Sequence, residues 1–296
     1  MEGLEARGDA RDAFRARNWH LAGGRHLALG PRAVIMGVLN TTPDSFSDGG
    51  DFLDTDTAVA RALEMVDEGA QIIDVGGEST RPGAAAVDGE TERARILPVI
   101  GALAETGRCA ISVDTYRAET ARAALEAGAH IVNDIWGCQR EPDIAQIAAQ
   151  YGAGLVMMNN RRGRALNGDV VSDACAFLAR SLEIAAAAGV ESQAIALDPG
   201  FGFAEGTDGD VPLLAGVSDL VALGFPVLIG TSRKRFLGEI TGRDAKNRDV
   251  ATAATSVVAR QQGAALFRVH DVATNRDALS VADALYDNAR SHTTAA

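Results

Sequence analysis

Lysine is almost missing from this 296-residue chain, which has only Lys234 and Lys246 among its 28 lysine and arginine residues. Acidic residues outnumber basic ones, and the formal net charge is -12. This excess of negative charge argues against non-specific binding of nucleic acid or of an anionic membrane surface. It does not exclude a small anionic ligand, which would need only a local cationic pocket.

Cysteine is also scarce, and long apolar runs are absent. Cys109, Cys138 and Cys175 are odd in number and irregularly spaced, so they suggest neither a metal-binding pattern nor a disulfide framework. No apolar run approaches the roughly 20 residues of a membrane span. Residues 1–17 mix acids with arginines and lack the apolar core of a signal peptide. We therefore expect a cytoplasmic protein without a membrane segment.

What the chain does contain is a repeated unit of apolar run, polar residue, loop and amphipathic segment. The amphipathic segments stop at glycine, as in Gly69-Ala70 and Gly128-Ala129, which suits the left-handed turn just past a helix end. Eight such units in about 250 residues predict an α/β fold of the (β/α)8 TIM barrel type. A doubly wound open sheet is the alternative, but no G-x-G-x-x-G fingerprint opens a helix. The apolar runs cover residues 33–39, 71–75, 110–113, 131–132, 155–158, 194–197, 226–229 and 264–269.

The N-terminal part reads differently from the repeat. Residues 18–30 carry alternating apolar side chains around Gly23-Gly24, which predicts a hairpin that could plug one end of the barrel. We expect residues 1–17 to form a polar arm, 18–290 a single barrel domain and 291–296 a polar tail. Both tails are expected to be short and disordered.

The first apolar run ends at Asn40 and is followed by ten residues without an aliphatic side chain. Residues 41–50 contain hydroxyls, two carboxylates, a glycine pair and Phe46. This composition indicates a functional loop at the carboxyl end of a buried strand, rather than a simple connector.

A polar residue stands at or just after the end of each predicted strand. A barrel directs all eight carboxyl ends at one face, where its active site lies. Since burying such a group unpaired costs several kcal/mol, eight of them in phase indicate a binding site. Asp74 is the weakest member, because Val75-Gly76-Gly77 follows and the acid could lie inside and hold the loop. The set comprises Asn40, Asp74, Asp114, Asn133, Asn159, Asp198, Thr231 and the pair Arg268 and His270.

Part of this set suits a flat, nitrogen-rich heterocycle. Asp198 lies in a stiff Asp-Pro-Gly turn and offers a carboxylate that matches two adjacent N–H donors. Asp114 and Asn133 could complete the recognition, and Phe203 could cover the face of the ring.

Another part suits phosphate or pyrophosphate. Arg268 and His270 are two residues apart on one predicted strand, so they point the same way. With Asn40 they make a cationic, donor-rich corner. Lys234 follows the seventh strand, where barrels often bind phosphate, and in a chain with two lysines we expect it to contact the ligand.

Together these stretches resemble bacterial dihydropteroate synthase, a folate-pathway enzyme of the pterin-binding barrel family. The matching stretches follow one another in the same order as in that family and span nearly the whole chain. The matching stretches are residues 37–50, 74–83, 112–115, 132–135, 198–203, 231–238 and 268–272.

The resemblance implies a transferase that joins 4-aminobenzoate to 6-hydroxymethyl-7,8-dihydropterin diphosphate, giving 7,8-dihydropteroate and pyrophosphate. It implies small-molecule substrates, a Mg²⁺ ion near Asn40, and a homodimer formed through the last helices, 251–262 and 277–289. The implied catalytic residues are Asp114, Lys234, Asn40, Arg268 and His270. The implied substrate-binding residues are Asn133, Asp198, Phe203, Phe46, Asp48, Thr80, Arg81, Pro82 and Met158.

The chain departs from the family pattern after the fifth strand. The family commonly has Met-His there, whereas this chain has Met158-Asn159. Asparagine keeps the hydrogen-bonding capacity of histidine but loses the titratable ring.

Two other functions are compatible with parts of the pattern. A pterin-binding barrel of the methyltransferase type would share Asp114, Asn133 and Asp198, but it would have no use for Phe46 or for the Arg268–His270 pair. A non-catalytic pterin-binding paralogue would not need to keep every residue of the set. The presence of these residues favours the synthase over both alternatives.

Overall fold

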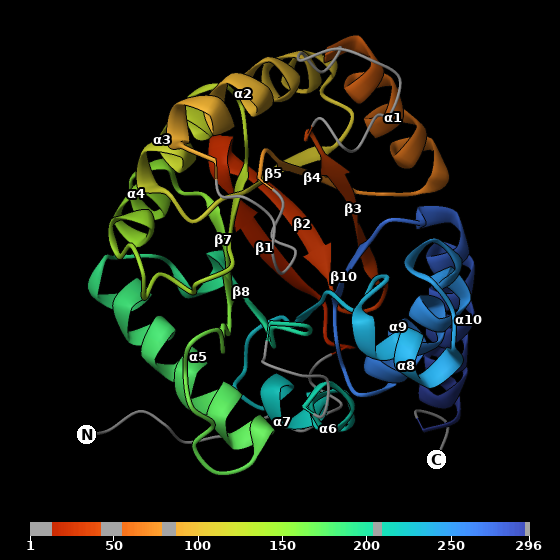
Figure 1. The fold of residues 1–296 in the computed structure, drawn as a ribbon. Coiled ribbons are helices and arrows are strands. Elements are labelled where there is room, and N and C mark those ends of the chain that lie inside the picture. Colours follow the sequence, from red (N-terminus) through yellow and green to blue (C-terminus); the bar gives the residue numbers. More distant parts are fainter. Residues whose placement is uncertain (1–13, 43–54, 79–86, 204–208, 294–296) are drawn as a thin grey trace.

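The structure is a computed structural model and describes residues 14–42, 55–78, 87–203 and 209–293, with side chains as far as Asp287. Within this part of the chain, eight parallel strands form one sheet in the order β8-β7-β6-β5-β4-β3-β10-β9. A further parallel bridge between Leu197 and Val227 joins the two outer strands and closes the sheet. The predicted TIM barrel is therefore confirmed (Figure 1). The strands are β3 (Val34–Asn40), β4 (Ile72–Gly76), β5 (Ala110–Asp114), β6 (Ile131–Asp134), β7 (Gly154–Met158), β8 (Ile195–Asp198), β9 (Leu228–Ile229) and β10 (Leu266–Val269).

Helices surround the barrel (Figure 1). Their predicted glycine stops are confirmed: Gly152 has a φ of 58° directly after α4, and Gly128 has a φ of 108°. A Cβ atom on Gly128 would also lie only 2.5 Å from Ala104 Cβ. The helices are α1 (Thr55–Glu68), α2 (Gly89–Thr106), α3 (Ala118–Glu126), α4 (Asp143–Tyr151), α5 (Val170–Ala187), α6 (Asp210–Ala215), α7 (Val217–Val221), α8 (Arg235–Thr241), α9 (Asp249–Gln261) and α10 (Val272–Thr293), with short 3-10 helices at Ala22–Gly24, Ser192–Ala194 and Ala245–Asn247.

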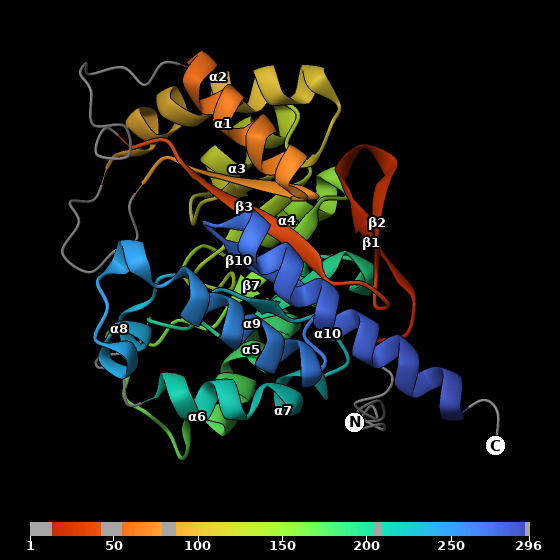
Figure 2. The same cartoon turned by 90° about the vertical axis from the view of Figure 1, so that its right-hand side faces the viewer.

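The predicted hairpin is present and closes one end of the barrel. Strands β1 (Arg17–Leu21) and β2 (Arg25–Leu29) are antiparallel. Trp19 is buried against the interior side chains at the amino ends of the barrel strands, and its Nε1 donates to the Ala194 carbonyl at 2.8 Å. Figure 2 shows the hairpin at the opposite end of the barrel from α8. The functional face must therefore be the carboxyl end of the barrel.

The end of the expected polar arm packs on the last helix. Phe14 is 6% exposed, and its ring stacks on Tyr286 with centroids 3.8 Å apart. One apolar side chain in this polar stretch therefore docks the end of the expected arm on α10. Helix α10 also continues to Thr293, past the expected start of the tail at 291. Residues 1–13 and 294–296 lie outside the described residues, and the division into arm, domain and tail stays a prediction.

The interior of the barrel changes from apolar to polar along the strands. Successive residues of a strand point to opposite faces, so every second residue faces inward. The lower inward layer is apolar and packs on the hairpin; it includes Ile72, Ala110, Ile131, Ala196 and Leu266. Two residues further along the same strands stand Asp74, Ser112, Asn133, Asp198 and Arg268. The polar strand ends are therefore the next layer of the core, and they face one another across the barrel.

No described helix is long and apolar enough to cross a membrane. All three cysteines are free thiols.

Candidate active site

Arg268 lies at the centre of a network that crosses the barrel. Its Nε donates to Asp74 Oδ2 at 2.6 Å, and its Nη2 donates to Asp114 Oδ2 at 2.7 Å. Asn133 Nδ2 donates to the same Asp74 oxygen at 3.0 Å. These side chains come from β10, β4, β5 and β6, so the fold brings them together from distant parts of the chain.

The charges of this network act on one another across short distances. Burial raises the pKa of Asp114 to about 7; Arg268 opposes this rise, and the nearby carboxylate of Asp74 adds to it. Burial acts to lower the pKa of Arg268, but Asp74 and Asp114 outweigh it and raise that pKa. The guanidinium therefore stays charged, whereas Asp114 titrates near neutral pH.

Asp198 ends β8 and is held by the turn that follows it. Its Oδ1 accepts the Gly200 N–H at 2.7 Å. Burial raises the pKa of Asp198 to about 6, opposed by that hydrogen bond and by the charge of Lys234. Gly200 has a φ of 84°, and a Cβ atom there would collide with the carbonyl oxygen of Asn159. Glycine at this position lets the turn pack against the end of β7.

Lys234 lies beside Phe203 at the barrel mouth, which is the end of the barrel where the carboxyl ends of the strands meet. Its Nζ is 4.5 Å from the centroid of the Phe203 ring, and the guanidinium carbon of Arg162 lies at the same distance from that centroid. Burial lowers the pKa of Lys234 to about 8, and Arg268 acts in the same direction, against Asp198 and Asp210. The Phe203 ring therefore makes cation–π contacts with both Lys234 and Arg162.

An apolar patch adjoins these charges. Ile135, Met158 and Phe203 are buried together, and Tyr116 and Trp136 pack against them. This patch offers an apolar surface to a flat ligand next to the carboxylates of the site.

Asn40 and His270 complete the mouth. Asn40 pairs in register with Gly76, which in turn pairs with Asp114. A Cβ on Gly76 would lie 3.9 Å from Asn40 Oδ1 and 3.5 Å from Asp114 Cβ, so the glycine leaves space between these two residues. His270 Nδ1 is 2.9 Å from Ser232 Oγ. Because Ser232 Oγ already accepts the His270 backbone N–H at 3.1 Å, its own hydrogen is available for Nδ1, which favours the Nε2–H tautomer.

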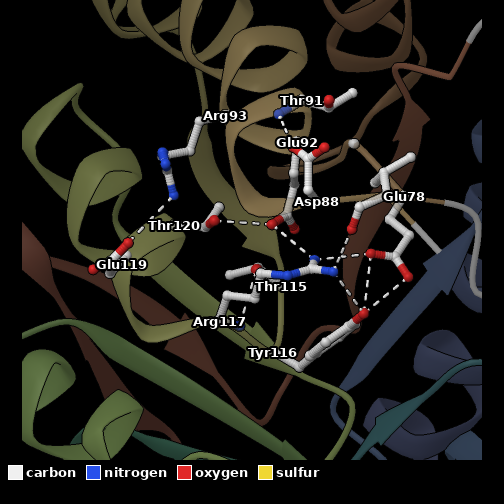
Figure 3. A network of polar contacts seen from close by, with 12 residues as sticks. Glu78, Asp88, Thr91, Glu92, Arg93, Thr115, Tyr116, Arg117, Glu119 and Thr120 are labelled. Carbon is white, nitrogen blue, oxygen red and sulfur yellow. Dashed lines mark hydrogen bonds and ion pairs between the residues drawn. The ribbon is translucent and has the colours of Figure 1, made fainter.

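A second network flanks the site at the start of α3 (Figure 3). Arg117 Nη1 donates to Glu78 at 2.8 Å and to the buried carboxylate of Glu92 at 3.0 Å. Its Nη2 donates to the Val87 carbonyl at 2.6 Å and to the Tyr116 hydroxyl at 2.9 Å. Tyr116 in turn donates to Glu78 at 2.9 Å. Arg117 therefore ties the end of β4, the approach to α2 and the end of β5 into one unit.

Two of the polar strand ends turn away from the mouth. Thr231 Oγ1 is buried and lies 2.7 Å from Thr255 Oγ1. Asn159 donates to the Pro199 carbonyl at 3.0 Å and accepts from Arg164 at 3.1 Å. Both side chains are satisfied within the scaffold, so they hold loops rather than face the mouth.

The structure brings most of the predicted site residues to the carboxyl end of the barrel. They are Asn40, Asp114, Asn133, Met158, Asp198, Phe203, Lys234, Arg268 and His270. The predicted residues Phe46, Asp48, Thr80, Arg81 and Pro82 lie outside the described residues. Sequence reasoning underestimated Asp74 and did not single out Ser232, Arg162 or Arg117. Side chains alternate between the two faces of a strand, so every second residue points inward. Only this alternation could have indicated that Asp74 shares a layer with Asn133 and Arg268.

The comparisons with known proteins agree with this geometry. The family model described as pterin binding enzyme matches residues 36–270. A dihydropteroate synthase from Streptococcus pyogenes is 46% identical over 251 residues, which cover 84% of this chain and 94% of the relative.

Solved structures give the same result. A dihydropteroate synthase from Xanthomonas albilineans with 4-aminobenzoic acid is 42% identical, with a TM-score of 0.85 and coverage of 91% of this chain and 98% of that one. The same organism's enzyme in complex with 7,8-dihydropteroate is 40% identical, with a TM-score of 0.82 and coverage of 90% and 98%. The resemblance noted in the sequence and the prediction of a transferase are confirmed: the chain belongs to the dihydropteroate synthase family of pterin binding enzymes.

Proposed function

We propose that this chain condenses 4-aminobenzoate with 6-hydroxymethyl-7,8-dihydropterin diphosphate, giving 7,8-dihydropteroate and pyrophosphate, and that the barrel mouth is its active site. The observation that carries this proposal is the convergence of Asp114, Asn133, Asp198, Lys234 and Arg268 in the buried polar interior at the carboxyl end of the barrel. The bound 4-aminobenzoic acid and 7,8-dihydropteroate of the Xanthomonas albilineans structures support it.

The pterin ring is assigned to Asp114, Asn133 and Asp198. The two carboxylates are acceptors for the ring N–H groups, and an amide can both donate and accept. Met158 and Phe203 supply the apolar surface for the face of the ring. A flat heterocycle with several N–H donors would supply hydrogen bonds to these buried acceptors.

The diphosphate is assigned to Arg268 and His270. The contacts of Arg268 with Asp74 and Asp114 use two of the five N–H groups of a guanidinium, which leaves others for phosphate oxygens. His270 would add a ring N–H donor beside the guanidinium. Both groups would stabilise the negative charge that grows on the departing pyrophosphate.

A Mg²⁺ ion fits this site only as a companion of the diphosphate. The described residues contain no group of three or more His, Cys, Asp or Glu side chains that could hold a metal. Mg²⁺ often takes one or two protein ligands and completes its shell with water and substrate phosphates, and the Asn40 side-chain oxygen beside Gly76 suits that role. When bound, the ion would supply Lewis-acid stabilisation of the leaving group.

The arylamine would approach over Phe203 and Lys234. Phe203 offers a ring surface, and Lys234 and Arg162 place positive charge at that ring. An amine bound to an aromatic ring is a weak nucleophile, so the barrier lies mainly in the departure of pyrophosphate. Asp114, as a carboxylate, is well placed to stabilise positive charge that develops on the pterin.

We also propose that the protein acts as a cytoplasmic homodimer assembled through α9 and α10. Three large apolar side chains on these helices are strongly exposed: Val250 at 79%, Val281 at 63% and Leu285 at 61%. Val281 and Leu285 are four residues apart and share one face of α10, and an exposed apolar face of this kind suits an interaction surface.

Pyrophosphate release tests the proposed activity. The assay contains the dihydropterin diphosphate, Mg²⁺ and 4-aminobenzoate, and each component is omitted in turn. Release that needs both organic substrates and the metal supports the synthase. Binding of the pterin without any release would contradict it and favour a non-catalytic paralogue.

A further inference from the structure

Asp74 is a fully buried acidic side chain of the barrel interior. It is 0% exposed and lies on β4, one inward layer below Asn40 and Asp114. A barrel interior at this depth is normally filled by branched apolar side chains. A carboxylate at this depth is unfavourable, because its burial costs several kcal/mol of folding free energy unless it is paired.

One oxygen atom of Asp74 carries both of its contacts. Oδ2 accepts from Arg268 Nε at 2.6 Å and from Asn133 Nδ2 at 3.0 Å. The contact with Nε fixes the plane of the Arg268 guanidinium, so that Nη2 reaches Asp114. The contact with Nδ2 fixes the amide of Asn133, so that its oxygen is directed away from Asp74.

The second carboxylate oxygen of Asp74, Oδ1, is buried without a hydrogen bond to any described residue. Among the same residues, Ser112 Oγ on the neighbouring strand, in register with Asp74, has no hydrogen-bond partner either. A group kept only for stability would be fully satisfied or replaced by an apolar residue. Only one oxygen of this carboxylate is hydrogen-bonded, and its presence is better explained by the orientation that it imposes on Arg268 and Asn133.

We propose that Asp74 is a positioning residue of the synthase reaction, whose carboxylate sets the orientation of both Arg268 and Asn133. This inference rests on the proposed function, since it concerns the pterin diphosphate site. Asp74 would act through its two partners without touching the substrate. It would therefore link the group assigned to the leaving diphosphate with a group assigned to the pterin ring.

The first test is Asp74→Asn, which keeps the size of the side chain and removes its charge. We expect kcat/KM for the dihydropterin diphosphate to fall at least tenfold, while the KM for 4-aminobenzoate changes less than about twofold. The matched control is Asp283→Asn. Asp283 is likewise a buried aspartate bonded to an arginine, with its Oδ1 2.7 Å from Arg260 Nε, but it lies on α10 outside the mouth. The control should lose stability and keep both KM values.

A double-mutant cycle separates positioning from direct contact. In the Arg268→Met background, Asp74→Asn should cost less than about threefold in kcat/KM, because one of the two residues that it orients is gone. Equal losses with and without Arg268 would overturn the proposal, as would a loss confined to the KM for 4-aminobenzoate. If Asp74→Asn does not fold, Asp74→Ser is measured in its place under the same criteria.

Calorimetric binding of the dihydropterin diphosphate keeps the two proposals apart. If the unmodified chain binds this compound but releases no pyrophosphate, the proposed function fails. The positioning role is then judged by affinity, and Asp74→Asn should weaken binding at least tenfold. Unchanged affinity would overturn the role of Asp74 whatever the activity of the chain.

Discussion

Burial sets the charge of individual side chains in the mouth, and this makes a pH prediction possible. The pKa of Asp114 is raised to about 7 and that of Asp198 to about 6, whereas the pKa of Lys234 is lowered to about 8. The two carboxyl groups accept hydrogen bonds at both oxygens and carry negative charge only after they lose a proton, and Lys234 is a cation only while it keeps one. We therefore expect kcat/KM to rise as pH increases through about 6 to 7 and to fall above about 8.

The alkaline limb of this profile can be assigned by one substitution. Lys234→Arg keeps a positive charge at all accessible pH values, so the fall above about pH 8 should disappear while the acid limb stays in place. The check is kcat/KM for pyrophosphate release, measured across the whole range for both proteins. Loss of the acid limb, or an unchanged alkaline limb, would mean that Lys234 does not carry the titration.

Removing a charged group of the mouth should damage activity without unfolding the protein. Asp114→Ala and Lys234→Ala are each expected to lower kcat/KM at least tenfold, about 1.4 kcal/mol of transition-state binding. The matched control is Lys246→Ala, which removes the chain's other, exposed lysine and should leave the kinetics unchanged. Normal kinetics in the Lys234→Ala protein would show that the pocket is assigned wrongly.

Sequence reasoning at this scale identified which residues end the strands, but not what each one contacts. Asp114, Asn133 and Asp198 were predicted because polar residues after apolar runs are visible in the chain. Thr231 follows the same rule, yet it bonds Thr255 on a surrounding helix. The pairing of Asp74 with Arg268 joins residues 194 positions apart, and only the closed barrel brings them together.

Among the elements, the β4–α2 and β5–α3 connections depend on Arg117. Glu92 is only 1% exposed, and its carboxylate pairs with this guanidinium. Removing one partner of a buried ion pair leaves an uncompensated charge and costs about 3 to 5 kcal/mol. We expect Arg117→Met to lower the free energy of unfolding by about that amount, as measured by urea denaturation.

The matched control is a weaker ion pair of the same two helices (Figure 3). Arg93 lies 3.7 Å from Glu119, whose side chain is 88% exposed. Exposed pairs contribute about 0 to 1 kcal/mol, so Arg93→Met should leave stability nearly unchanged. If the two variants were equally stable, the Arg117 network would not hold the connections.

Strand positions were well predicted, whereas strand ends were not. The predicted runs stopped at the last apolar residue, but the backbone ladder continues through Asn40, Asp114 and Asp198. Strand β9 is shorter than its apolar run, since Val227 forms only an isolated bridge to β8. Hydrophobicity reports which side chains are buried, and the ladder depends on backbone geometry that the side-chain pattern does not encode.

For the whole molecule, the apolar side chains left exposed on α9 and α10 lead to a prediction about assembly. Val281 and Leu285 are four residues apart and share one face of α10. The double variant Val281→Glu, Leu285→Glu should convert a dimer into a monomer, because buried unpaired charge disfavours association. Light scattering after size-exclusion chromatography gives the mass. Leu166→Glu, an exposed apolar residue of a loop, is the control and should leave the mass unchanged.

The overall architecture was predictable because a barrel repeats its signal eight times. One β–α unit is ambiguous, whereas eight in order leave little choice of fold. The hairpin was predictable for a similar reason, since alternation around Gly23-Gly24 is a local pattern. The docking of Phe14 on Tyr286 was not, because nothing near Phe14 in the sequence indicates a partner 272 positions away.

The central claim is that the polar side chains at the carboxyl end of the barrel bind the pterin diphosphate. A crystal structure of this chain with 6-hydroxymethyl-7,8-dihydropterin diphosphate and Mg²⁺ tests it most directly. We predict ring N–H groups bonded to Asp114 and Asp198, and diphosphate oxygens bonded to Arg268. A pterin ring bound away from Asp198, or a diphosphate that does not contact Arg268, would contradict the account.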